Sequence, residues 1–455
     1  MTAAEIFKEK LRKDTFHEIF EKYLEGRASR GVDGQTAEQF KLKLDLEVEW
    51  ILKKVESGSY RFTPYREKLI SKGANSNPRQ ISVPTVRDKL VLRFLTDVLT
   101  DVFPESRSKP PHDYIKKIHE YSSNVSLNPD THYLRLDVQS FYPSIDHKIL
   151  LKVIRRKVRK KELINLIEGA IKTPTGVTKK QCLVNERGVP QGLSISNILA
   201  AIYLHDIDQK LMSRHNICYS RFVDDILIIG SRSDVDVLSK ELPKLIKSRK
   251  KLTLHPLGVG NKSSLEPVHI GVDYLGYHIC GKTIEVRKTS FRKMYSNLMK
   301  IFTAMKHVKK RHMPKLIWRL NLSITGCVFE EKRVGWLFFF AQSKNTRQLE
   351  NLDDFVQKTI SNIDNVAIED LSRVKKFRKA YREIRHNFNT SRYYINFDTM
   401  SDEEKRNNIK VLLPHINSKK LDDLIGEELQ RLFKKCVAKE VYTMERDLLR
   451  TDNPS

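Results

Sequence analysis

Apolar residues recur at helical spacing near both ends of the chain, with a different pattern in between. Residues 1 to about 60 carry apolar positions at this spacing, interrupted by the glycine-containing turn Gly31–Gly34. From about Ser290 onward the pattern is again almost entirely helical, and it ends in an apolar stripe from Leu429 to Leu448. We therefore predict helical regions at both ends, with the last stripe facing either a core or a subunit interface.

The middle of the chain contains patterns typical of strands and hairpins. Arg66–Lys72 and Arg79–Val83 flank a run of turn-forming residues, which predicts a hairpin with basic flanks. Tyr133–Val138 alternates apolar and polar positions as a strand does. Residues 217–230 are apolar on both sides of an Asp-Asp pair. This segment predicts a second hairpin with two carboxylates at its tip.

Charge narrows the possible function classes. The 455 residues include 83 Lys plus Arg against 56 Asp plus Glu, and the formal net charge of +27 is typical of a protein that binds nucleic acid.

The five cysteines form no Cys-x-x-Cys pair, so neither a disulfide framework nor a cysteine-rich zinc site is expected. The longest apolar run, Trp336–Ala341, is too short to span a bilayer. We expect a cytoplasmic protein with no membrane role.

Asp137, Asp224 and Asp225 form the candidate chemical centre. An Asp-Asp pair alone is weak evidence, because most such pairs lie in solvated turns. Here apolar residues flank the pair on both sides, and buried charges are unfavourable unless they face a metal ion or a cleft. Nucleotidyl transfer uses two divalent ions, and Mg²⁺ needs only one or two carboxylates plus substrate phosphates and water. Aspartates at the ends of adjacent strands would supply these ligands.

Three sequence blocks resemble those of the reverse transcriptases, particularly the bacterial enzymes related to group II introns, retrons and phage defence. They occur in the family's order and spacing, and they are Leu136–Asp146, Gly188–Gly192 and Phe222–Asp225. Further similarity lies in Gly31–Gly34, Arg79–Thr85 and Tyr274–Tyr277. The resemblance covers roughly residues 30 to 340. Phe222 stands where the family more commonly has tyrosine, but it preserves the aromatic ring.

The resemblance implies a metal site and four catalytic residues. Asp137, Asp224 and Asp225, with the main-chain carbonyl of Val138, would bind two Mg²⁺ ions, for which Mn²⁺ could substitute. Lys262 resembles the lysine that protonates the departing pyrophosphate. The sequence around Lys262 is not a nucleotide-binding P-loop, because the glycine spacing and the Gly-Lys dipeptide of that motif are missing.

The resemblance also implies which residues bind the nucleotide and the primer. Lys72 and Arg79 match the basic pair that family members place over the incoming triphosphate, where charge-assisted bonds to phosphate are strong. Tyr142 matches an aromatic ring that would collide with a ribose 2′-hydroxyl, which favours DNA synthesis. The other residues expected in the nucleotide pocket are Phe141, Gln191 and Gly192. The expected primer or template contacts are Phe222, Val223, Tyr274, Leu275, Gly276 and Tyr277.

The resemblance further implies a fold and a domain order. We expect an α+β right-hand polymerase in which an antiparallel sheet forms the palm and carries the three aspartates. The expected parts are N-terminal helices and fingers (1–110), the palm (111–285), a helical thumb (286–345) and a helical C-terminal region (346–455).

The expected function is RNA-directed DNA synthesis, with a noncoding RNA copied in antiviral defence. The C-terminal part shows no Cys/His nuclease motif of the kind that many mobile introns append, which favours a host function over mobility. A group II intron-type maturase and a catalytically silent RNA-binding subunit are the alternatives. The expected partners are an RNA template, deoxynucleotides, the DNA product, and either further copies of the chain or a second protein subunit.

Overall fold

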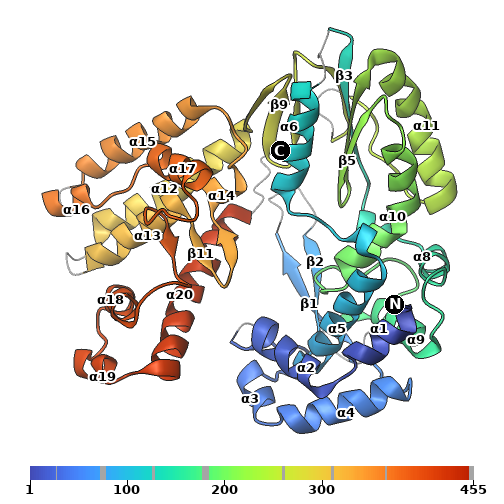
Figure 1. Ribbon diagram of the computed structural model, residues 1–455, viewed down its shortest axis with the longest axis horizontal. Coiled ribbons are helices and arrows are strands. Elements are labelled where there is room, and N and C mark those ends of the chain that lie inside the picture. The colour runs from blue at the N-terminus through green and yellow to red at the C-terminus, as the bar shows by residue number, and fades with distance from the viewer. Residues whose placement is uncertain are drawn as a thin grey trace. The chain divides into compact units, whose positions relative to one another are not determined.

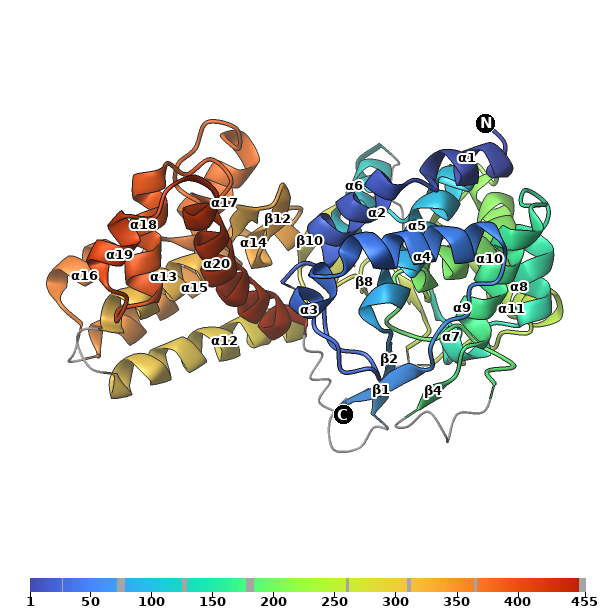
Figure 2. The same ribbon diagram turned by 90° about the horizontal axis from the view of Figure 1, so that it is seen from below.

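In a computed structural model, the chain divides into two compact units (Figures 1 and 2). The structure describes residues 1–26, 28–71, 78–124, 129–176, 184–258, 262–308, 312–363 and 366–449. The first unit comprises residues 1–110 and 128–267, and the second comprises residues 111–127 and 268–451. The finer division into fingers, palm, thumb and C-terminal region stays a prediction.

A four-stranded antiparallel sheet lies at the centre of the first unit (Figure 1). In spatial order its strands are β5 (Cys218–Phe222), β6 (Asp225–Ser231), β3 (Thr131–Asp137) and β7 (Ser264–Pro267). β3 alternates buried and half-buried positions over much of its length, whereas the middle of β6 is buried throughout. Helices α10 (Ser196–Met212) and α11 (Arg232–Lys250) pack against its strands. The predicted α+β class with an antiparallel sheet is confirmed.

The N-terminal helices of the first unit enclose helix α5 (Val86–Val102). Three helices pack against it (Figure 2): α1 (Ala3–Lys10), α2 (Lys13–Ile19) and α4 (Leu44–Glu56). Their apolar residues share one buried core with α5 and with the central sheet. The other helical elements are η1 (Phe20–Leu24), α3 (Ala37–Lys41), η2 (Pro104–Ser106), α7 (Phe141–Ser144), α8 (His147–Ile154) and α9 (Lys161–Lys172).

The basic hairpin predicted ahead of α5 is present. Its strands are β1 (Tyr65–Ile70) and β2 (Arg79–Val83), and Ile70 lies opposite Arg79 in antiparallel register. On its other side, β1 pairs with the short parallel strand β4 (Thr175–Gly176). The hairpin therefore belongs to a second, separate sheet of the first unit.

The second unit is mainly helical and contains two small sheets. Their strands, in spatial order, are β10 (Thr283–Val286), β9 (Tyr277–Cys280) and β8 (Val272–Tyr274), then β12 (Lys332–Val334), β11 (Cys327–Phe329) and β13 (Ile395–Asn396). Its helices are α6 (Pro111–Asn124), α12 (Lys288–His307), α13 (Met313–Thr325), α14 (Trp336–Phe339), α15 (Thr346–Ser361), α16 (Ile368–Ser372), α17 (Phe377–His386), α18 (Asp402–Leu412), α19 (Ser418–Asp422) and α20 (Gly426–Leu449). The helical pattern beyond Ser290 missed β11–β13, because strands of two or three residues leave no periodic signal.

The C-terminal apolar stripe lies inside the second unit. Leu429, Phe433 and Val437 on α20 share a buried cluster with Ile409 and Leu412 of α18. Of the two predicted roles, the structure thus shows a core within the chain. Among the residues that the structure describes, no helix is long and apolar enough to cross a membrane.

Candidate active site

The central sheet brings the three predicted aspartates to one end. Asp137 is the last residue of β3 and pairs in register with Asp225, the first residue of β6. Phe222 closes β5 opposite Asp225, so that Val223 and Asp224 form the two-residue turn between β5 and β6. The main chain of Asp224 is tied to β3, because the N–H of Val138 donates to its carbonyl at 3.1 Å. Residues far apart in sequence thus become neighbours through strand register alone.

A buried arginine stabilises this turn by a hydrogen bond to its main chain. Val223 has φ +58, a left-handed conformation that is strained for a β-branched residue. Arg221 donates from Nη1 to the carbonyl of Val223 at 2.8 Å and from Nε to Oδ1 of Asp208 at 2.7 Å. A hydroxyl from Tyr219 donates to the same carboxylate at 2.6 Å. Asp208, on helix α10, therefore anchors the side chain that holds the turn in place.

Basic side chains surround the aspartates. Arg135 donates from Nε and Nη2 to the two carboxylate oxygens of Asp225, at 2.9 and 3.0 Å. The ammonium of Lys262 lies 3.8 Å from Oδ1 of Asp137, and Nε2 of His255 lies 3.4 Å from the same oxygen. These basic side chains therefore offset part of the negative charge of the three aspartates.

The acids nevertheless destabilise one another's charge. Burial raises the pKa of Asp225 to about 6; Arg135 acts against that rise, while Asp137 and Asp224 add to it. Burial also raises the pKa of Asp224, and the charge of Asp137 adds to the effect against Lys262 and Arg79. Mutual repulsion of this kind is what a bound divalent cation relieves.

The donor chemistry fits magnesium ions that arrive with a substrate. Carboxylate oxygens are the hard ligands that Mg²⁺ prefers, and Asp137 and Asp225 face each other in register. In the part of the chain that the structure describes, no group of three or more His, Cys, Asp or Glu side chains is placed to hold a metal ion. Mg²⁺ does not require such a group, because phosphate oxygens and water fill most of its coordination sphere.

The tyrosine predicted to exclude ribonucleotides lies beside these acids. Tyr142 is half-buried and donates its hydroxyl to Oδ1 of Asn197 at 2.5 Å. Burial raises the pKa of this tyrosine to about 12, the charge of Asp224 adds to that rise and Arg79 opposes it. Tyr142, Asp224 and Arg79 therefore lie within electrostatic reach of one another. Phe141, in contrast, is buried and packs its ring against that of Tyr142 at a centroid distance of 5.7 Å.

The glycine-containing loop packs between the basic hairpin and this tyrosine segment. Ser82 on β2 donates its N–H to the carbonyl of Gln191 at 2.7 Å. Gly192 has φ +97, and a Cβ there would lie 2.5 Å from Cγ2 of Ile81. Gly188 is equally confined, since its Cβ would lie 2.7 Å from the carbonyl oxygen of Pro143. Both glycines are therefore required by close approach and by backbone conformation.

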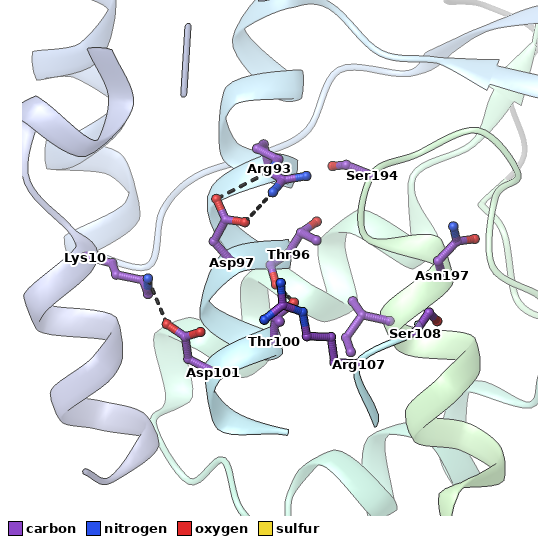
Figure 3. Close-up of a pocket in the computed structure, with 11 residues that line it drawn as sticks. Lys10, Arg93, Thr96, Asp97, Thr100, Asp101, Arg107, Ser108, Ser194 and Asn197 are labelled. Atoms are coloured by element: carbon purple, nitrogen blue, oxygen red, sulfur yellow. Dashed lines mark hydrogen bonds and ion pairs between the residues drawn. The ribbon is translucent and has the colours of Figure 1, made fainter. Parts of the chain in front are cut away.

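A polar pocket opens behind the loop. It has a volume of about 410 Å³, and its lining residues come from α1, α5, α10 and the segment after α5 (Figure 3). Two ion pairs lie in its wall, Lys10 with Asp101 at 2.8 Å and Arg93 with Asp97 at 2.8 Å. Asn197, which accepts the hydroxyl of Tyr142, also lines the pocket. The hydrogen-bond partner of Tyr142 is thus reachable from solvent.

The remaining predicted residues lie elsewhere. Tyr274 and Tyr277 pair across a turn formed by Leu275 and Gly276 in the second unit, and both rings are fully buried there. The left-handed φ values of Leu275 (+48) and Gly276 (+82) fit that turn. Their contact with a primer stays a prediction. Lys72 lies outside the described residues.

The sequence analysis did not predict four residues of the site. They are Arg135, Asn197, Asp208 and His255. Only Arg135 had a local signal: two residues before Asp137 in an alternating strand, it had to share a face with that aspartate. The other three meet the site through tertiary packing.

Comparisons with known proteins found one family model and several relatives that are similar in sequence to this chain. A family model described as "Reverse transcriptase (RNA-dependent DNA polymerase)" matches residues 70–279. Protein YkfC of Escherichia coli K12 is 21% identical over 348 residues, which is 66% of this chain and 86% of that protein. The group II intron-encoded protein LtrA of Lactococcus lactis subsp. cremoris is 22% identical over 44% of this chain and 34% of its own length. The retron Se72 reverse transcriptase of Salmonella heidelberg is 27% identical over 44% of this chain and 48% of its own length.

Proposed function

We propose that the chain copies RNA into DNA by two-metal nucleotidyl transfer. The match of residues 70–279 to the reverse transcriptase family model supports this proposal, as does the similarity to a group II intron-encoded protein and a retron reverse transcriptase. The observation that carries this proposal is the register of the central sheet. It sets Asp137 opposite Asp225 and leaves Asp224 in the adjoining turn. Such a cluster at the open end of a sheet has no structural use that outweighs the repulsion among its charges.

In the proposed mechanism, Asp137, Asp224, Asp225 and the carbonyl of Val138 hold two Mg²⁺ ions, with Mn²⁺ as a substitute. When bound, the ions activate the primer hydroxyl and neutralise the triphosphate. The primer 3′-hydroxyl loses its proton to solvent water as its oxygen forms a bond to the α-phosphorus, and the bond from that phosphorus to the pyrophosphate oxygen breaks. Lys262, 3.8 Å from Asp137, donates a proton to the departing pyrophosphate.

Other residues select and orient the nucleotide. Arg79 pairs with the phosphates, with Lys72 as the proposed second cation. The ring of Tyr142, held by its bond to Asn197, blocks space that a 2′-hydroxyl would need. Gln191 and Gly192 line the proposed nucleotide pocket. A side chain at Gly192 would collide with Ile81 of β2. Phe141 supports Tyr142 from the core, since its own ring is buried.

We propose that the template is a noncoding RNA and that the DNA product serves antiviral defence. The resemblance of the sequence blocks to the phage-defence enzymes supports this assignment. A bacterial host that carries the gene should lose protection against phage when Asp224 is changed to asparagine. Equal plaque counts for both forms would contradict the defence role without touching the polymerase chemistry.

The second candidate function is a catalytically silent RNA-binding subunit. One observation favours it: both oxygens of Asp225 are already bonded to Arg135, so this acid needs no metal for charge balance. A group II intron-type maturase role, the other alternative, would depend on RNA binding in the same way.

The deciding experiment compares wild type with Asp224→Asn/Asp225→Asn. The chain is purified with its bound nucleic acid and given Mg²⁺ and labelled deoxynucleotides. We expect labelled DNA from the wild type alone, and none after the preparation is treated with ribonuclease. The matched control is Asp422→Asn/Asp423→Asn, an exposed Asp-Asp pair in the second unit, which should leave synthesis unchanged. No product from wild type, with RNA still bound, would favour the silent subunit.

A further inference from the structure

The second unit contains a short segment of unusually high positive charge. Residues 373–393 include eight lysines and arginines against one acidic residue, Glu383. The net charge of +7 is about a quarter of the whole chain's +27, carried by about a twentieth of its length. The segment includes helix α17 and the turn after it.

Helix α17 separates this charge from the core. Its apolar residues are buried, and they are Phe377, Ala380, Tyr381 and Ile384. Arg378, Arg382 and Arg385 are exposed and lie at spacings of four and three residues, which places them along one face of the helix. At a rise of about 1.5 Å per residue, this row is about 10 Å long. Such a row can follow consecutive phosphates of one strand.

The backbone beneath the row is fixed by polar side chains from two other helices. Asp353 of α15 accepts the N–H groups of Phe377 and Arg378 at 2.5 and 3.2 Å, and so caps α17. Asn321 of α13 accepts the N–H of Lys375 at 2.8 Å and donates to the carbonyl of Arg373 at 2.9 Å. The cations are therefore presented from a rigid support, which lowers the entropy lost on binding.

Aromatic rings alternate with the cations. The ring centre of Tyr393 lies 4.7 Å from the ammonium of Lys379 and 5.4 Å from that of Lys375. The guanidinium of Arg333 lies 3.8 Å over the ring of Phe388. Both rings are partly exposed. Phe388 also stacks in parallel on Tyr394, with ring centres 5.3 Å apart, so its ring supports this surface from within the unit. A partly exposed ring such as Tyr393 beside cations is a combination that can hold unpaired bases together with their phosphates.

Local acids leave most of this charge unpaired. Arg378 has an exposed ion pair with Glu350 at 3.2 Å. The side chain of Asn387 donates to the carboxylate of Glu383 at 3.2 Å. Among the described residues, no ion pair is recorded for Lys379, Arg382 or Arg385. The exposed positions of α17 carry no apolar side chain, which argues against insertion into a lipid surface.

We propose that the row Arg378, Arg382 and Arg385, with the flanking ring of Tyr393, binds the sugar–phosphate backbone of a single-stranded nucleic acid. This surface lies in the second unit, whereas the three aspartates lie in the first, so it extends the proposed function without being part of its chemistry. RNA and DNA share the recognised chemistry, and RNA is the strand expected to be bound before synthesis begins.

The test uses two triple variants of the full chain that change the same charge at the same spacing. Arg378→Gln/Arg382→Gln/Arg385→Gln removes the row. Lys240→Gln/Lys244→Gln/Lys247→Gln removes three exposed cations of α11, also spaced by four and three residues, in the first unit. Binding of a labelled single-stranded RNA, and of a DNA of the same sequence, is measured by fluorescence anisotropy without deoxynucleotides and over a range of salt concentrations.

Each phosphate contact on a single strand contributes about 0.7 to the slope of log affinity against log salt. We expect the α17 variant to lower the magnitude of that slope by about 2. If the variant and wild type bind alike at 1 M salt, the variant should then bind about 100-fold more weakly than wild type at 0.1 M salt. The α11 variant should bind as wild type does. Because Arg385 also contacts the hydroxyl of Tyr381, the charge-preserving Arg378→Lys/Arg382→Lys/Arg385→Lys variant serves as the folding control and should retain binding.

Equal weakening by both glutamine variants would overturn the proposal, because only net charge would then matter. Unchanged binding by the α17 variant would overturn it as well. Weakening for RNA, or for RNA and DNA together, supports it; weakening for DNA alone assigns the surface to the product strand. The binding test does not depend on the polymerase proposal. The Asp224→Asn/Asp225→Asn variant should lose synthesis but bind RNA with unchanged affinity.

Discussion

Loss of the buried Asp208–Arg221 ion pair should loosen the turn that carries Asp224. The Arg221 side chain is 8% exposed and that of Asp208 is 12% exposed. We consider Asp208→Ala, which leaves the guanidinium buried without its counter-ion. The hydroxyl of Tyr219 loses its acceptor in the same step. Arg221 then keeps its hydrogen bond to the carbonyl of Val223 but has lost the carboxylate that balanced its charge.

The expected loss of stability is large for a single substitution. Removing one partner of a buried ion pair costs about 3–5 kcal/mol. Because both side chains keep a small exposed fraction, we take the lower limit, about 3 kcal/mol. This corresponds to a roughly 100-fold increase in the local opening constant at 25 °C, since 1.36 kcal/mol is a factor of ten.

Hydrogen exchange of peptides from β5 and β6 measures this opening directly and needs no assumption about how two units unfold. Asp236→Ala is the matched control, because Asp236 forms an exposed ion pair with Arg232 on α11, and such pairs contribute about 1 kcal/mol or less. Asp208→Leu/Arg221→Met replaces the buried pair with apolar residues and should regain most of the protection.

A measurement of DNA synthesis distinguishes two roles of Arg221, which are positioning of the turn that carries Asp224 and stabilisation of the fold. Asp208→Leu/Arg221→Met still lacks the bond from Arg221 to the strained Val223, so we expect kcat to stay at least about tenfold below wild type. Full activity in this double variant, or unchanged exchange in Asp208→Ala, would refute the idea that Arg221 positions Asp224 through the turn.

Three further outcomes follow from the same geometry. Tyr142→Val should lower discrimination against ribonucleotides by about tenfold or more, measured as the ratio of kcat/KM values for deoxynucleotide and ribonucleotide; an unchanged ratio would contradict the steric role of the ring. Gly192→Ala should raise KM for deoxynucleotides, because its Cβ would lie 2.5 Å from Ile81, whereas Gly281→Ala, with a positive φ but open space, should not. Arg135→Gln should lower the Mg²⁺ concentration needed for half-maximal synthesis, because the guanidinium occupies both carboxylate oxygens of Asp225 and competes with the ion for them; a higher required concentration would contradict this competition.

Local patterns were sufficient to predict the elements that form the site. The alternation that ends at Asp137 and the apolar runs on both sides of Asp224 predicted β3 and the β5–β6 hairpin, and both are present. The basic hairpin was predicted from its turn-forming residues. These predictions succeed because period-two alternation and turn chemistry are properties of a few consecutive residues.

Contacts between distant segments could not be predicted in the same way. Asp208 reaches Arg221 only because α10 packs on β5, and Asn197 reaches Tyr142 only because α10 begins beside the tyrosine segment. His255 approaches Asp137 through paired main-chain segments after α11. No spacing in the sequence encodes these distances. The fully buried rings of Tyr274 and Tyr277 also carry no sequence signal that separates a core role from a primer contact.

The pairing of Arg135 with Asp225 shows how one strand can supply both the acid and its compensation. In an extended strand, residues two apart point to the same face. Arg135 and Asp137 therefore share a face of β3, and antiparallel register places Asp225 opposite Asp137, within reach of the arginine. The protein can then fold with three neighbouring carboxylates before any metal is bound, because part of their repulsion is already offset. An arginine two residues before the first aspartate thus offsets part of the repulsion within the cluster that the same strand helps to form.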